Sequence, residues 1–279
     1  GGAIALVITG NSSIGGAISN ATSFSVSGTT SLGASVTTTT GGQTYSGAVT
    51  LAASPTLTSP TGTILFSSTV DGGFTLTITN SGSTGDVTFT GAVGTTSLTG
   101  LTITTDILTA AAIRSTGTLS VTNTGTSSIT GIISENVSAL AVTKAGAGTL
   151  TLSGANTYTG LTTVSAGTLK LGATGGATNT PLGTTTAGTV VSTNGTLDLA
   201  GFTLGTAEAL TLNGTGTGSI GALMNSGSAA TYSGNITLGT ASTIKNAGTF
   251  SLTGNINGGF GLTLTTTSFF PDGDWKGSK

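Results

Sequence analysis

The sequence contains no cysteine and no histidine, and only 6 basic and 8 acidic residues stand among its 279 residues. Without cysteine there are no disulfides and no thiolate chemistry. Without histidine the chain lacks the imidazole base and the imidazole metal ligand. Six basic residues spread over this length cannot neutralise a run of phosphates, which argues against nucleic-acid binding and against attraction to an anionic membrane surface. No stretch reaches the roughly 20 apolar residues of a membrane-spanning helix, so we expect no membrane insertion.

The residues that are abundant are small. There are 48 glycines, and hydrophobic residues make up 35% of the chain, most of the larger ones being Leu, Ile and Val at short spacings. A formal net charge of -2 does not fit the highly charged composition of disordered chains. The composition therefore predicts a folded protein whose core consists of thin aliphatic layers.

A short unit recurs along the chain and gives a period in the range of solenoid proteins. It consists of Asn or Lys, any residue and Gly, with Ser/Thr-Gly following six to nine residues later, and its starts are Asn80, Asn123, Lys144, Asn225 and Asn246. The intervals between successive starts are close to two, one, four and one times a period of about 21 residues. A second marker, Gly-Thr before an aliphatic or aromatic residue, has nearly the same period from Gly148 through Gly167 to Gly188.

The residues within each unit alternate as in a β-strand. In "GTLTLSG", Leu150 and Leu152 share one face, and Thr149 and Thr151 share the other. We therefore predict an all-β protein, a right-handed parallel β-helix with about 21 residues per turn. Residues 1–267 are expected to form a single solenoid domain, followed by an aromatic and charged tail at 268–279.

Residues 142–172, "VTKAGAGTLTLSGANTYTGLTTVSAGTLKLG", resemble the autotransporter-associated β-strand repeat of passenger domains in bacterial surface proteins. The similarity lies in the Gly-Thr-Leu-x-Leu pairs, the corner segment "ANTYTG" and the final segment "VSAGTLKLG". The resemblance implies an exported protein, extracellular or held at the bacterial cell surface. Proteins of this kind are commonly adhesins, biofilm components or fibres.

Candidates for chemistry are few, and each has a simpler interpretation. Lys170 and Asp198 occupy equivalent positions that we expect to face water, and a polysaccharide enzyme would need them clustered with further carboxylates and Arg114, the only arginine. The stretch 216–221, "GTGSIG", matches a dinucleotide fingerprint without the helix that this motif requires. Asp272 and Asp274 are too few for calcium. We expect no catalytic residue, no cofactor and no metal site.

The two ends are the candidate sites of self-association, because the terminal turns of a β-helix leave unpaired backbone groups. No ionised side chain precedes Asp71 in the sequence. Residues 1–10, "GGAIALVITG", are either a cap or a strand that completes the sheet of another copy. The candidate residues are Ala3, Ile4, Leu6, Val7, Ile8, Phe269, Phe270 and Trp275.

These features favour a structural protein that joins copies of itself end to end into a surface fibre or matrix element. The alternative is a monomeric passenger adhesin whose hydroxyl-rich faces bind glycans or host surfaces. A polysaccharide lyase or hydrolase is a more distant alternative.

Overall fold

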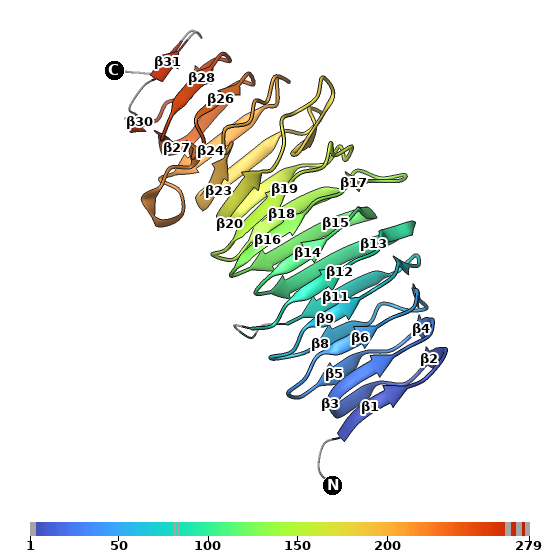
Figure 1. Ribbon diagram of the computed structural model, residues 1–279. Coiled ribbons are helices and arrows are strands. Elements are labelled where there is room, and N and C mark those ends of the chain that lie inside the picture. Colours follow the sequence, from blue (N-terminus) through green and yellow to red (C-terminus); the bar gives the residue numbers. More distant parts are fainter. Residues whose placement is uncertain (1–3, 81, 83, 266–268, 272–274, 277–279) are drawn as a thin grey trace. The chain divides into compact units, whose positions relative to one another are not determined.

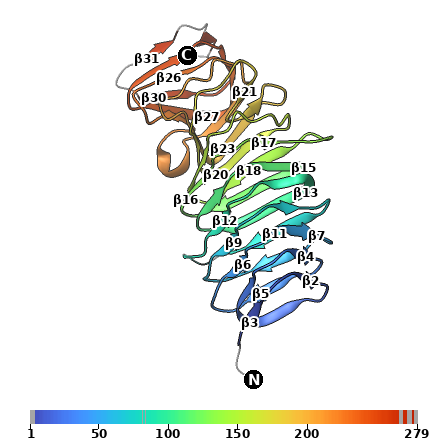
Figure 2. The same ribbon diagram turned by 45° about the vertical axis from the view of Figure 1, so that its right-hand side comes forward.

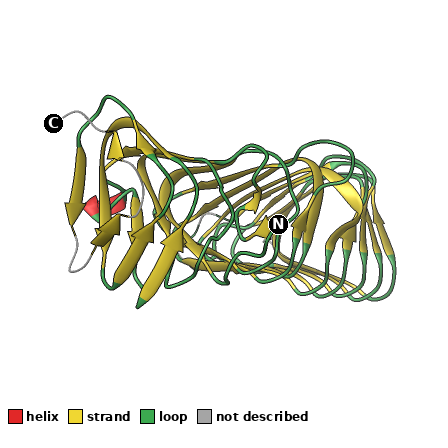
Figure 3. Cartoon of the chain, turned by 90° about the horizontal axis from the view of Figure 1, so that it is seen from above, coloured by secondary structure: helices red, strands yellow, loops and turns green. Residues whose placement is uncertain are grey.

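The computed structural model describes residues 4–80, 82, 84–265, 269–271 and 275–276. The chain divides into two compact units, residues 1–140 and 141–279, which are taken separately below. In the described part of the chain, all regular structure is β-strand apart from one short 3-10 helix, η1 (Thr217–Ser219) (Figures 1 and 3). The prediction of an all-β fold is therefore confirmed.

Unit 1 consists of short strands joined by tight corners. They are β1 (Ile4–Ile8), β2 (Ser12–Ile14), β3 (Ile18–Val26), β4 (Thr30–Leu32), β5 (Val36–Thr38), β6 (Gln43–Tyr45), β7 (Val49–Leu51), β8 (Thr56–Thr58), β9 (Ile64–Phe66), β10 (Val70–Asp71), β11 (Thr75–Thr79), β12 (Val87–Phe89), β13 (Val93–Thr105), β14 (Leu108–Ala110), β15 (Ile113–Asn123), β16 (Thr126–Ile129) and β17 (Ile133–Ser134).

Each strand of unit 1 pairs in parallel with the strand about one turn later, so successive turns lie side by side (Figure 2). Val36 is the register partner of Leu57, Gln43 of Ile64 and Val49 of Val70, so the partners in each pair are one period apart in the sequence. Three strands complete a turn, which gives the unit three faces. Unit 1 is thus a parallel β-solenoid. The turns measured by these three pairs have the predicted length, and other turns of the unit are shorter or longer.

Inward-facing side chains of the same kind stack on one another through unit 1. Phe24, Tyr45, Phe66 and Phe89 form one column, with successive ring centroids 5.6, 5.0 and 4.8 Å apart. Stacked aromatic pairs add about 0.5 to 1.5 kcal/mol each beyond the area that they bury. The Tyr45 hydroxyl donates to Gln43 Oε1 at 2.9 Å, and this bond satisfies a polar group inside the core.

Unit 2 has the same construction with longer and less regular turns. Its strands are β18 (Ala141–Ala145), β19 (Thr149–Leu152), β20 (Thr162–Leu171), β21 (Asn179–Thr180), β22 (Gly183–Thr184), β23 (Thr189–Asp198), β24 (Leu210–Gly214), β25 (Leu223–Asn225), β26 (Ala229–Tyr232), β27 (Ile236–Asn246), β28 (Thr249–Leu252), β29 (Ile256–Asn257), β30 (Leu262–Thr265), β31 (Phe269–Pro271) and β32 (Trp275–Lys276).

Among the described residues of unit 2, the pairing is parallel except in the small β21–β22 hairpin and in an isolated bridge between Asn156 and Thr180. Leu150 pairs with Leu169 and Thr162 pairs with Thr189, so the turn that follows Thr162 is the longer of the two. This longer turn contains the hairpin. Insertions of this kind leave the register of the flanking strands intact because they lie in the corners.

The predicted alternation is confirmed in β19. Leu150 and Leu152 are fully buried, while Thr149 and Thr151 are partly exposed. The handedness of the coil and the assignment of residues 1–267 to one domain stay predictions.

Truncation of an inward leucine should destabilise the protein far more than truncation of its outward neighbour. For Leu152→Ala we expect a loss of about 2 to 5 kcal/mol, because the cavity lies between two packed turns. For Thr151→Ala the change should stay within about 0.5 kcal/mol. Urea unfolding followed by circular dichroism measures both, and equal losses would contradict the inward assignment of Leu152.

Candidate functional site

The first turn of unit 1 leaves the end of the core open. In the described chain, β1 pairs only with β3, so the backbone groups along its other edge have no strand beside them. Leu6 and Ile8 are aligned with the buried residues Phe24 and Val26, yet they are only partly buried. Ile4 and Val7 are 70% and 69% exposed. Four of the five predicted amino-terminal residues thus lie on one open strand, and the fifth, Ala3, is outside the described residues.

The carboxy-terminal candidates are described by their backbone alone. β31, which contains Phe269 and Phe270, pairs in parallel with β28. β32, which begins at Trp275, pairs in parallel with β29. The ladder therefore continues into the predicted tail. Asp272 and Asp274 lie outside the described residues.

The repeated Asn or Lys of the sequence marker holds the corner between two strands. Asn225 Nδ2 donates to the carbonyl of Gly227 at 3.2 Å, and Asn246 Nδ2 makes the same bond to Gly248. Both asparagine side chains are buried. Asn123 makes the same bond to Gly125, whereas Asn80 donates to the carbonyls of Gly62 and Asp86. In these copies the side chain satisfies a backbone carbonyl at the corner.

Lys144 takes this corner position in the best-preserved repeat. Its side chain is completely buried, and Nζ donates to the carbonyls of Ala145, Gly146 and Ala166 at 2.7, 2.8 and 3.2 Å. Burial lowers the pKa of Lys144 to about 8. The third bond crosses to the next turn, so Lys144 ties two turns of unit 2 together.

Loss of this ammonium group should destabilise unit 2. Lys144→Met keeps the length of the side chain but removes the donor from three carbonyl groups, which should cost about 1 to 3 kcal/mol. Lys170→Met is the matched control, since Lys170 lies on the outer side of β20 between the buried residues Leu169 and Leu171. Thermal unfolding of both variants tests the assignment, and an equal loss in the control would refute it.

A second buried polar cluster lies in unit 2 around Glu208. The side chain is fully buried, and Oε1 accepts a hydrogen bond from Thr189 Oγ1 at 3.0 Å. Oε2 has no hydrogen-bond partner among the described residues. The hydroxyl of Tyr232 donates to the backbone carbonyl of Glu208 at 2.9 Å, and the hydroxyl of Tyr158 bonds to that of Thr162.

Burial raises the pKa of Glu208 to about 7, although the hydrogen bond from Thr189 opposes the shift. Tyr158 and Tyr232 also have raised pKa values, mainly through burial and also through the Glu208 charge, so they stay neutral around pH 7. The fold therefore favours the protonated carboxyl of Glu208, whereas the unfolded chain loses this proton near pH 4.5.

Stability should consequently fall as the pH rises through this window. The contribution of neutral Glu208 is fully present below about pH 4.5 and is lost as the pH approaches 7, at up to about 1.4 kcal/mol per pH unit. Glu208→Gln should flatten the dependence between about pH 5 and pH 7.5 in urea titrations. Glu135→Gln, in unit 1, should leave it unchanged. A slope in the Glu208→Gln protein equal to that of the parent would contradict the assignment.

The two charges expected on the outer face have different environments. Lys170 and Asp198 are register partners, which confirms their equivalence, and Lys170 is partly exposed. The expectation that Asp198 faces water is wrong, because this side chain is 4% exposed. Its oxygens accept hydrogen bonds from the backbone N–H groups of Ala200 and Ser226 and from the Ser226 hydroxyl, so a long corner covers it.

The remaining motifs of the sequence lie on a turn in unit 2 and in a pocket of unit 1. Residues 217–219 of "GTGSIG" form the 3-10 turn η1. Arg114 lies in unit 1, in a pocket whose lining contains neither a lysine nor a carboxylate. Within the described residues, no three acidic side chains come close enough to hold a metal ion, and no helix is long and apolar enough to cross a membrane.

The parallel register of successive turns makes unit 2 a β-solenoid. Residues 142–171 match the family model described as Passenger-associated-transport-repeat. The match spans β18, β19 and β20, and it confirms the resemblance found in the sequence. A search of curated proteins and a search of solved structures found no match. The repeat and the fold indicate an autotransporter passenger domain, and this repeat implies a secreted or cell-surface protein.

Proposed function

We propose that this protein is a structural extracellular subunit that associates end to end with copies of itself, forming a surface fibre or matrix element. The observation that carries the proposal is the open edge of β1, which pairs on one side only in the described chain. An unpaired strand edge with exposed apolar side chains is a template for another strand.

The occupant of this edge would be a second copy of the chain. Near the other end of the described sequence, β30 pairs only with β27, and its Leu262 and Leu264 are partly buried. Leu6 and Ile8 on β1 have the same alternate spacing and the same partial burial. Contact between β1 of one copy and β30 of the next would cover both pairs. Because the two surfaces differ, such a contact repeats without closing and leads to a filament.

The charge distribution supports the same arrangement. The sequence has no ionised side chain before Asp71, so no like charge repels an approaching copy at this end. Proteins that keep their edges free usually place lysine or another charge there. Its absence favours association by the hydrogen-bond ladder and by apolar contact.

A charge placed at the open end should prevent assembly. Leu6→Lys, or removal of residues 1–10, should abolish filaments, because a buried unpaired ammonium is too costly at a stacked interface. Ser31→Lys is the control, since Ser31 lies on the outer side of β4 between two buried residues. Electron microscopy and sedimentation velocity of the three proteins measure the effect. Filaments of unchanged length in Leu6→Lys would exclude this interface.

A monomeric adhesin is the second candidate, favoured by the passenger repeat at residues 142–171. A stable monomer in size-exclusion chromatography that still binds cells would support the adhesin and exclude the fibre. We propose a non-enzymatic function in both cases, since the lining of the Arg114 pocket offers no acid or base pair for hydrolysis.

A further inference from the structure

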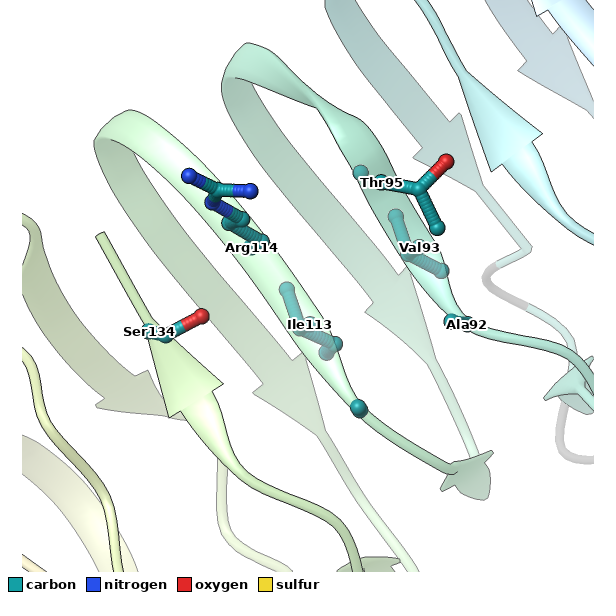
Figure 4. A pocket seen from close by; sticks show the side chains of 8 residues that line it. Ala92, Val93, Thr95, Ile113, Arg114 and Ser134 are labelled. Atoms are coloured by element: carbon teal, nitrogen blue, oxygen red, sulfur yellow. The ribbon is translucent and has the colours of Figure 1, made fainter. Parts of the chain in front are cut away.

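An open pocket of about 290 Å³ lies on the outer face of unit 1, over the starts of β13 and β15 and the end of β17 (Figure 4). Its floor is formed by small and apolar residues, among them Gly94 and Ala112. Its polar groups come from three neighbouring strands, with Arg114 between Thr95 and Ser134 in Figure 4. The volume is near the lower limit for small-molecule sites, and it suits a ligand of one or two rings.

Gly94 lines the pocket without a side chain. Val70 pairs with Val93 and Val93 with Ile113, so Asp71, Gly94 and Arg114 each follow a residue of one inward column, and Arg114 is the register partner of Ser134. The register between β13 and β15 shifts after Val93. Gly94 has a φ of +82°, and a Cβ there would lie 2.0 Å from the carbonyl oxygen of Arg114. Only glycine fits, so β13 contributes no side chain at this position and its backbone packs closely against that of Arg114.

Arg114 has unused hydrogen-bonding capacity at the side of this pocket. Its Nη2 donates to Asn136 Oδ1 at 2.9 Å, and it forms no ion pair with an acidic side chain of the described residues. Glu135, the acid that follows the adjacent strand β17, accepts a hydrogen bond from the backbone N–H of Leu140. A guanidinium has five donors in a planar fork that matches a carboxylate. A ligand that complements the positive charge of Arg114 in this pocket would therefore be an anion.

On the opposite side the pocket is lined by Thr95, which is hydrogen-bonded to Asp71, a residue next to the pocket but outside its lining. Thr95 Oγ1 donates to Asp71 Oδ1, and the backbone N–H of Thr96 donates to the same oxygen at 2.9 Å. The lone pairs of the Thr95 hydroxyl and the second oxygen of Asp71 remain to accept hydrogen bonds from a ligand. A ligand that spans the pocket would thus carry a carboxylate at one end and hydroxyl donors at the other.

We infer that this pocket binds an acidic sugar, with the carboxylate against Arg114, the ring hydroxyls toward Thr95 and Asp71, and the C–H face of the ring over Gly94 and Ala112. A simple carboxylate would bind only to Arg114. A neutral sugar would form hydrogen bonds only with Thr95 and Asp71. The site lies on a side face of unit 1, so it does not depend on the proposed end-to-end contact.

The test is an NMR titration of the full ¹⁵N-labelled chain with three matched probes and a peptide. Methyl glucuronide carries the ring and the carboxylate, methyl glucoside the ring alone, and acetate the carboxylate alone, while Gly-Glu-Gly represents an acidic peptide. We expect methyl glucuronide to shift the amide signals of Gly94 and Thr95 and the Nε signal of Arg114. The other three probes should bind at least about tenfold more weakly, since each loses one set of charge-assisted or hydroxyl bonds.

Variants assign the binding to the pocket. Arg114→Gln should weaken methyl glucuronide binding about tenfold or more, and Arg114→Lys, which keeps the charge but not the fork, should weaken it less. Lys170→Gln removes the same charge from the outer face of unit 2 and should change nothing. Both Arg114 side-chain changes are at a partly exposed position, and the dispersion of the amide spectrum checks the fold. Equal binding by the parent and Arg114→Gln, tighter binding of the peptide, equal binding of acetate, or no shift with methyl glucuronide would each overturn the inference.

Discussion

The parallel hydrogen-bond ladder between successive turns is the constraint on which the structure depends. Each residue of a strand faces its counterpart one turn later, so neighbouring turns must supply side chains of similar kind at the same place. In unit 1 an inward column runs through Val49, Val70, Val93, Ile113 and Ile133. The uniform composition follows from this requirement, because a charged side chain on an inward column would face apolar neighbours on both sides.

Corners are the places where the ladder cannot satisfy the backbone, and several of the buried polar residues donate to carbonyls there. Asn225 and Asn246 each donate to a glycine carbonyl two residues later, and Lys144 donates to three carbonyls at the equivalent point. Glu208 is different, since it has one oxygen without a hydrogen-bond partner in the described part of the chain. Asn225, Asn246 and Lys144 supply donors to backbone carbonyls at the corners. Glu208 instead makes the free energy of unfolding depend on pH, because its buried carboxyl favours the protonated form.

The period, the alternation in β19 and the parallel fold could be predicted because they repeat in the sequence. The burial of Asp198 could not, because it depends on a corner whose bond donor, Ser226, lies 28 residues away. The Arg114 pocket could not be predicted for a related reason. Turn lengths in unit 1 vary, with Leu76 paired to Leu101 but Leu101 to Leu119, so the proximity of Gly94 to Arg114 becomes visible only in the structure.

Specific recognition on a repetitive scaffold must come from positions that break the repeat. Most outward positions carry a hydroxyl or another small polar group, and such a surface gives a ligand no preferred register along the turns. Gly94 lines the pocket without a side chain, and Arg114, the single arginine of the sequence, lines it beside Gly94. β1 is the other exception, since in the described residues it pairs with β3 alone and its apolar side chains are less buried than their counterparts in β3. The proposed binding site and the proposed assembly contact use different residues of unit 1, so the two proposals do not exclude each other.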